Sequence, residues 1–127
     1  MANERRRFVR FQVTSPTYAA LGHNFDKVGK VKDISVGGFA FEYISDQDSM
    51  EAMTHVDILL LDEDIHLSKL PCTVAYERDV RKHDTLRRFG RPLVTKQCGV
   101  KFGNLAENQR NQLEHLITRH TLGRCPD

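Results

Sequence analysis

The stretch from Gly29 to Ile44 reads GKVKDISVGGFAFEYI, and its pattern decides the fold. Apolar and polar side chains nearly alternate over residues 29–34 and again over residues 39–44. A period of two is typical of a half-buried β-strand, because successive side chains point to opposite faces of a sheet. The residues between, Ser35 to Gly38, favour a tight turn. We therefore predict two strands joined as a hairpin.

Similar short segments occur before and after this pair. Further strands are predicted near residues 8–14, 55–61, 65–70, 72–77 and 97–102, with a loop or a short helical turn at 46–54. Pro71 lacks a backbone N–H and should mark an edge or a bulge, and Asp62 to Asp64 should form a turn. The residues at strand spacing are expected to form the core: Phe39, Phe41, Tyr43, Val56, Ile58, Leu60, Val74, Tyr76, Val100 and Phe102.

The period changes near the C-terminus. Leu105, Leu113, Leu116 and Ile117 fall at helical spacing, which predicts a helix at about 106–121. Several short strands followed by one terminal helix indicate a mainly all-β fold, an antiparallel barrel or sandwich rather than a parallel α/β fold. The chain has 127 residues and no long linker, so we expect one domain over 8–127, overlapping a flexible basic arm at 1–12.

The composition is that of an ordinary globular domain. Hydrophobic residues make up 39% of the chain and charged residues 28%, which supports a core without disulfides. The cysteines are odd in number and lack CxxC spacing, so neither a disulfide framework nor a cysteine zinc site is expected. No apolar run approaches the roughly 20 residues of a membrane helix, and no signal peptide is evident. We expect a cytoplasmic protein without membrane insertion.

Charge is spread unevenly along the sequence, although the net charge is only +2. Residues 42–64 are acidic and contain no Lys or Arg, whereas residues 5–10 and 78–96 are basic. This distribution suggests an anionic ligand, with a solvated charged face as the alternative. Gly90 and Pro92 indicate that residues 78–96 form an exposed hairpin tip or a mobile loop, a candidate surface for a partner.

Two short motifs carry the candidate chemistry. Arg6 and Arg10 have an RxxxR spacing, with Arg7 between them, and Asp33 to Gly38 form a DxSxxG turn. Guanidinium groups bind phosphate bidentately and stack on bases. A carboxylate at Asp33 can accept from the N–H edge of guanine, as acidic side chains do when they read bases. The Ser35 hydroxyl can serve a phosphate, a base or its own backbone, and Gly37 and Gly38 permit positive φ and close approach of a ligand.

Together the two motifs resemble the signature of the PilZ family. The order is that of the family, since Asp33 follows 23 positions after Arg10, and QCGVKF at 97–102 followed by a helix is also similar. The resemblance implies a six-stranded antiparallel barrel of the split-barrel type with a C-terminal helix. It implies a non-enzymatic bacterial receptor for the second messenger cyclic di-GMP, binding one ligand or a stacked pair. The implied ligand contacts are Arg6, Arg7, Arg10, Asp33, Ser35, Gly37 and Gly38.

The sequence gives little support for catalysis, metal binding or nucleic-acid binding. The sequence has no GxSxG nucleophile motif and no phosphate-binding P-loop, so no catalytic residues are expected. His115 and His120 are five residues apart, which does not place them on one helical face, so no metal site is expected. A nucleotide-independent adaptor in motility or secretion is the alternative function. A barrel that binds RNA or single-stranded DNA ranks last, because the basic segment 78–96 has only Phe89 as an aromatic residue, and no specific nucleic acid is expected. The downstream protein partner is not identified by the sequence.

Overall fold

A computed structural model of the chain describes residues 10–13, 16–22, 27–45, 53–88, 90–119 and 121–124. Eight strands, one helix and one short 3-10 turn make up this part of the chain. They are β1 (Phe11–Val13), β2 (Thr17–Leu21), β3 (Lys27–Ile34), β4 (Gly38–Ser45), β5 (Met53–Leu60), η1 (Leu61–Glu63), β6 (Ile65–Arg88), β7 (Arg91–Phe102), α1 (Glu107–Arg119) and β8 (Thr121–Arg124).

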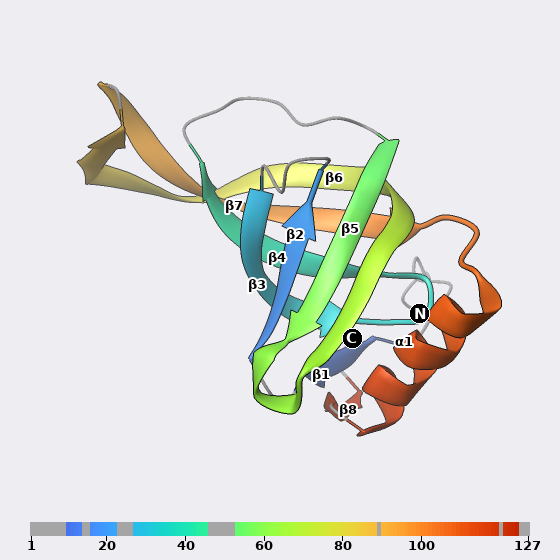
Figure 1. Cartoon of the computed structure of the whole chain (residues 1–127). Helices are drawn as coiled ribbons and strands as arrows, with labels where there is room; N and C mark the ends of the chain where they lie inside the picture. The colour runs from blue at the N-terminus through green and yellow to red at the C-terminus, as the bar shows by residue number, and fades with distance from the viewer. Residues whose placement is uncertain are drawn as a thin grey trace, which may run out of the picture.

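The strands form a closed antiparallel ring (Figure 1). Hydrogen-bonded neighbours follow the order β2, β5, β6, β7, β4 and β3, and a pairing between β2 and β3 closes the ring. Strand β1 pairs with β3 outside this ring, and β8 pairs with β1. The prediction of a mainly β fold with a C-terminal helix is confirmed, and the closure shows a six-stranded barrel rather than a sandwich.

Aromatic and aliphatic side chains fill the barrel. Phe39, Phe41 and Tyr43 project inward from β4, with ring centroids 5.7 Å apart for the first two and 5.4 Å apart for the last two. Helix α1 covers one end of the barrel and buries Leu113, Leu116 and Ile117. The burial of this apolar stripe explains why the sequence shows a helical period only here.

A hydrogen-bonded side chain fixes the start of this helix. The Gln109 amide nitrogen donates to the carbonyl of Ser68 at 3.1 Å, and its oxygen accepts from the backbone N–H of Ala106 at 2.9 Å. One side chain therefore satisfies a backbone donor at the helix N-terminus and ties α1 to β6.

Strands β6 and β7 continue beyond the barrel as a two-stranded hairpin (Figure 1). The pairing of β6 with β5 ends at Thr73, whereas its pairing with β7 runs to Arg88. Gly90 has a φ of 78° at the turn, a conformation that favours glycine. Residues 78–96, which we call the β6–β7 ribbon, thus form the hairpin expected for this basic segment.

The structure departs from the predicted elements at several places. Strands β2 and β8 were not predicted, and α1 covers 107–119 rather than 106–121. Residues 8, 9 and 14 of the first predicted strand, and residues 46–52, lie outside the described residues.

Pro71 does not interrupt the sheet. It lies inside one continuous β6 and is paired with His55 of β5, so the two predicted strands are one, but no residue of β7 is paired with it, as expected of an edge position. Its missing N–H is tolerated because the pairing of β6 with β7 begins only at the next residue, Cys72. The Pro71 carbonyl still accepts from the N–H of Gly103 at 2.7 Å.

Candidate functional site

The turn between β3 and β4 is held by one serine. The Ser35 hydroxyl accepts from the N–H groups of Gly37 and Gly38, each at 3.1 Å, and donates to the Gly38 carbonyl at 3.2 Å. The Ser35 N–H also donates to that carbonyl, at 2.7 Å. Because a hydroxyl has one donor and two acceptor sites, these contacts use its full capacity. Ser35 serves its own backbone, one of the three roles expected from the sequence.

Gly38 is required by a close approach of two strands. A Cβ atom at this position would lie 2.0 Å from the carbonyl oxygen of Val100 in β7. The φ of Gly38 is not in the left-handed region, and the described glycines with positive φ are Gly22 and Gly90. The Gly37 carbonyl accepts from the N–H of Phe102 at 2.9 Å, which ties the turn to β7. Of the two reasons expected for glycine here, close backbone approach therefore applies at Gly38, but toward β7.

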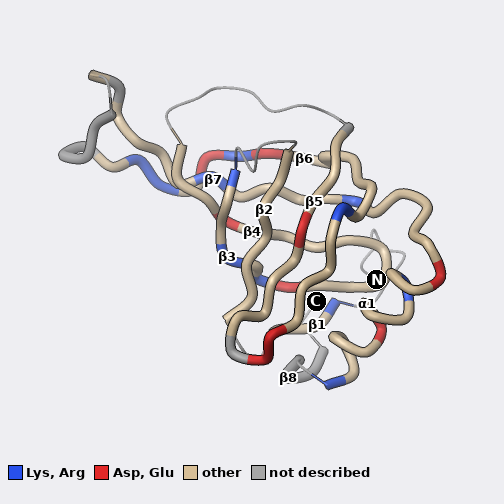
Figure 2. Tube along the Cα trace, in the orientation of Figure 1, with Lys and Arg blue, Asp and Glu red and all other residues tan. Residues whose placement is uncertain are grey.

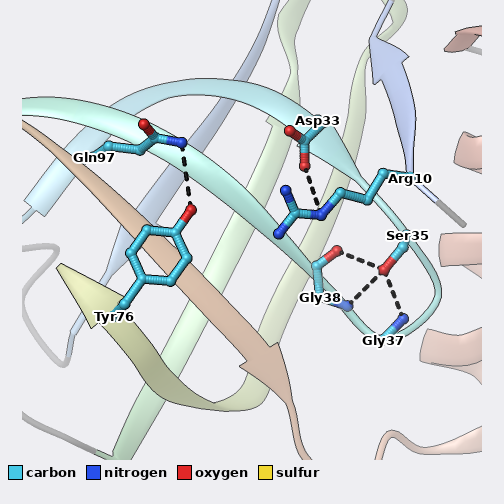
Figure 3. Close-up of polar contacts among 7 residues, drawn as sticks. All are labelled: Arg10, Asp33, Ser35, Gly37, Gly38, Tyr76 and Gln97. Carbon is cyan, nitrogen blue, oxygen red and sulfur yellow. Dashed lines mark hydrogen bonds and ion pairs between the residues drawn. The ribbon is translucent and has the colours of Figure 1, made fainter. Parts of the chain in front are cut away.

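Asp33 lies beside this turn and faces Arg10. The Arg10 Nε atom lies 3.5 Å from Asp33 Oδ1, an ion pair in which both side chains are largely buried. Figure 3 shows Arg10 extending between the Asp33 carboxylate and the Ser35 turn. Asp33 Oδ1 itself is buried and has no hydrogen-bond partner. The carboxylate is 17% exposed and its second oxygen, Oδ2, points away from Arg10 (Figure 3), so Oδ2 can accept an external N–H.

A row of residues crosses the outer face of the barrel from this corner. Asp33 of β3 is opposite Ala40 of β4, Ala40 is opposite Gly99 of β7, and Gly99 is opposite Tyr76 of β6. Neighbouring strands lie about 4.8 Å apart, so the row is roughly 14 Å long. The two central residues have a methyl group or no side chain. The row is therefore a low floor between a carboxylate at one end and an aromatic ring at the other, and its centre is buried, with Ala40 0% exposed and the Tyr76 ring over Gly99.

Tyr76 covers the glycine beside it. A Cβ atom at Gly99 would lie 2.0 Å from Cε1 of the Tyr76 ring, so only glycine allows the ring to lie there. The Gln97 side-chain amide donates to the Tyr76 hydroxyl at 3.3 Å, and Arg78 NH2 donates to the Gln97 oxygen at 2.8 Å (Figure 3 shows Tyr76 and Gln97). Tyr76 is 37% exposed, so the ring remains open to a ligand.

This position of Tyr76 corrects the prediction that it belongs to the core. The register of β6 against β7 shifts between Val74, opposite Val100, and Tyr76, opposite Gly99. A β-bulge of this kind moves the following side chains to the other face of the sheet. Tyr76 and Arg78 were missed as site residues for this reason, and Gln97 of β7 was missed because its role depends on its contacts with these two. The glycine in QCGVKF was the one available signal, since an aromatic ring often packs over a glycine in the neighbouring strand.

Basic side chains surround the floor. Lys30 and Lys32 of β3, Lys101 of β7 and Arg78 of β6 are exposed. Glu42 is the acidic neighbour among them and pairs with Lys32 at 3.2 Å. Cationic side chains in excess around an uncharged floor favour an anionic ligand.

The predicted site residues are partly brought together. Arg10, Asp33, Ser35, Gly37 and Gly38 lie at one corner of the barrel, whereas Arg6 and Arg7 lie outside the described residues. Within the described ranges no cluster of three or more His, Cys, Asp or Glu could hold a metal ion. The same part of the chain contains no helix with the length and hydropathy needed to cross a membrane.

Comparison with known proteins gives a family and a fold. No curated protein matches the sequence. The PilZ domain of YcgR from Escherichia coli, solved with c-di-GMP, superposes with a TM-score of 0.61 at 15% identity, over 91% of this chain and 90% of that one. The MrkH–c-di-GMP complex of K. pneumonia has a TM-score of 0.63 and 16% identity, over 92% of this chain and 52% of that one. The Bacillus subtilis inhibitor of motility MotI/DgrA has a TM-score of 0.62 and 15% identity, over 92% of this chain and 51% of that one.

These likenesses show a shared fold, and the chain spans about half the length of the MrkH and MotI chains. The family model of the PilZ domain matches residues 4–119, which is most of the sequence and includes both motifs. The chain therefore belongs to the PilZ domain family.

Proposed function

We propose that this protein is a non-enzymatic receptor for cyclic di-GMP that binds the nucleotide on the outer face described above. The observation that carries the proposal is the Asp33–Arg10 ion pair at one end of the floor, with Arg10 Nε 3.5 Å from Asp33 Oδ1 and the second carboxylate oxygen directed away from Arg10. Guanine presents two adjacent N–H donors on its Watson–Crick edge, which match a carboxylate acceptor. Arginine beside it supplies the cation that a phosphate requires.

Each residue of the motifs has a distinct role in this proposal. Asp33 accepts from guanine, and Arg10, with Arg6 and Arg7 before it, binds phosphate oxygens and base faces. Ser35 acts by holding the turn, because its hydroxyl is already fully used by Gly37 and Gly38. The two glycines hold the turn against β7, Gly38 by its close approach to Val100 and Gly37 through its carbonyl bond to Phe102. This differs from the prediction from the sequence, in which the Ser35 hydroxyl contacts the ligand directly.

The floor and Tyr76 complete the site. Ala40 and Gly99 are buried, so the nucleotide reaches the floor at its two ends, Asp33 and Tyr76. The exposed Tyr76 ring, oriented by Gln97, offers a stacking surface at the far end. Stacking of a base on an aromatic ring is worth about 1–3 kcal/mol in nucleic-acid complexes.

We further propose how binding becomes a signal. The chain before β1 acts as an arm that closes over the nucleotide through its arginines, which changes the surface offered to a downstream protein in the cytoplasm; the predicted boundary at residue 12 was wrong, because Phe11 and Gln12 pair with β3. A ligand that binds one arrangement better shifts the population toward it. MrkH is a transcription regulatory factor and MotI is an inhibitor of motility, so the shared fold does not specify the partner.

Calorimetric titration tests the binding proposal. We expect cyclic di-GMP to bind and GTP to give no heat under the same conditions. Arg10→Ala should weaken binding roughly 10- to 100-fold, because a charge-assisted hydrogen bond contributes about 1.5–3 kcal/mol. Arg119→Ala, which removes the same group from the exposed end of α1, is the matched control. No heat from folded wild-type protein would favour the nucleotide-independent adaptor instead.

A further inference from the structure

Two lysines are almost completely buried at the end of the barrel from which the β6–β7 ribbon extends. Lys27 of β3 is 8% exposed and Lys96 of β7 is 7% exposed. Lysine is rarely buried unless it is paired, because taking an ammonium group out of water is costly. None of the binding contacts proposed above uses either residue. Their surroundings therefore require a separate explanation.

The buried lysines belong to a polar cluster inside the barrel end. Lys96 Nζ lies 3.6 Å from Glu77 Oε1 and 3.8 Å from Asp79 Oδ1. The Tyr43 hydroxyl donates to Glu77, and Lys27 Nζ lies 5.5 Å from the centroid of the Tyr43 ring. Burial first, and then the hydrogen bond to Glu77, raise the pKa of Tyr43, so its hydroxyl stays a donor. We call Tyr43, Glu77 and Lys96 the core of this cluster.

The cluster lies one peptide bond from the nucleotide face. Tyr76 projects outward over Gly99, whereas Glu77, the next residue of β6, is opposite Cys98 and projects inward. Any movement of the Tyr76 backbone is therefore transmitted directly to Glu77. Side chains on opposite faces of one strand can couple in this way because the backbone between them is stiff.

The cluster also lies at the base of the ribbon. Asp79 is opposite Lys96 in the register of β6 and β7, and the pairing of β7 with β4 ends at Val94. Figure 2 shows acidic and basic residues following one another along β6 where it leaves the barrel. Lys96 thus lies at nearly equal distances from an inner acceptor, Glu77, and from Asp79, whose side chain is 55% exposed. Lys96 therefore bridges an inner and an outer carboxylate, and a small shift of its ammonium group would favour one over the other.

We propose that Tyr43, Glu77 and Lys96 transmit occupancy of the nucleotide face to the β6–β7 ribbon. The inference rests on the proposed function and names the regulation of the same site. A base stacked on Tyr76 shifts the balance of the Lys96 ammonium group between Glu77 and Asp79. This balance determines how firmly the ribbon is held against the barrel. The residues of the cluster are positioning residues, since none of them contacts the nucleotide.

Hydrogen exchange of the ribbon amides, with and without cyclic di-GMP, tests the proposal. In the wild-type protein we expect the nucleotide to change exchange over the ribbon about fivefold or more, the lower end of ordinary coupling between two sites. Tyr43→Phe removes only the hydroxyl and should still bind in calorimetry while losing most of the ribbon response. Glu77→Gln, which keeps the shape of the side chain, should do the same. Tyr18→Phe on β2 is the matched control and should respond like the wild type.

Each outcome decides a different claim. Binding by the wild type without any change in ribbon exchange would overturn the coupling and leave the receptor function standing. A full ribbon response in both Tyr43→Phe and Glu77→Gln would show that the ribbon responds through other residues. Absence of binding by the wild type would overturn the receptor function and the coupling together.

Discussion

Replacement of Gly38 by alanine should destabilise the protein strongly. The new Cβ atom would lie 2.0 Å from the Val100 carbonyl oxygen and 3.2 Å from the Lys101 Cα atom, both in the backbone of β7. Ordinary C···O contacts are about 3.3–3.6 Å, so β4 and β7 must separate by more than about 1 Å. Overpacking commonly costs 1–3 kcal/mol, and a weakened strand hydrogen bond adds about 1 kcal/mol. We expect a total loss of about 2–4 kcal/mol.

Thermal unfolding followed by circular dichroism measures this loss. For a domain of this size, about 4 °C of Tm corresponds to 1 kcal/mol, so Tm should fall by roughly 8–16 °C. Gly103→Ala is the matched control, because its nearest neighbour would be a Pro71 carbon at 3.4 Å, an ordinary contact. Its Tm should change by less than about 4 °C. If the Tm of Gly38→Ala falls by less than about 4 °C, as expected for Gly103→Ala, the close approach of β4 and β7 is not the reason that position 38 requires glycine.

Further predictions concern the turn, the floor and the buried thiols. Ser35→Ala should lower the unfolding free energy by about 1–3 kcal/mol in urea titrations, since two N–H groups lose their acceptor. Gly99→Ala should displace the Tyr76 ring, so the loss of cyclic di-GMP binding free energy in calorimetry should exceed the loss of unfolding free energy inferred from Tm. A larger loss of unfolding free energy than of binding free energy would contradict the stacking role. Burial raises the pKa of Cys72 and of Cys98 to about 12. Unfolded thiols ionise near pH 9, so the unfolding free energy should fall as pH rises from about 9 to 12, by at most about 1.4 kcal/mol per pH unit for each thiol. Urea unfolding at pH 8, 9.5 and 10.5 checks this, and Cys98→Ala should show a smaller decline.

Alternation was sufficient to predict most of the barrel. The GKVKDI and FAFEYI segments became β3 and β4 because apolar residues recur at every second position. Strand β2 was missed because its sequence, TYAAL, does not alternate, and four of its five residues are buried. Alanine also has a low strand propensity, so pairing with β3 and β5 decides its conformation. Such pairing is long-range and leaves no local pattern.

The candidate site was predicted at one corner and missed at the other. The types and order of Arg10, Asp33 and Ser35 indicated an anion- and base-binding turn, and the structure brings them together. Tyr76 was assigned to the core because the alternation of β6 was extrapolated through Val74. The bulge between these two residues reverses the faces, and a bulge has no dependable signature in a single sequence.

The length of β6 beyond its pairing with β5 also bears on solubility. A closed barrel has no free strand edges, but β6 after Thr73 presents N–H and C=O groups that no described strand of the chain pairs on that side. An open edge of this kind is a template for adding strands from other molecules, which leads to aggregation. Arg78, Arg81 and Lys82 are exposed along it, and their mutual repulsion between molecules disfavours such stacking. These charges let the ribbon project into solvent without recruiting further copies of the chain.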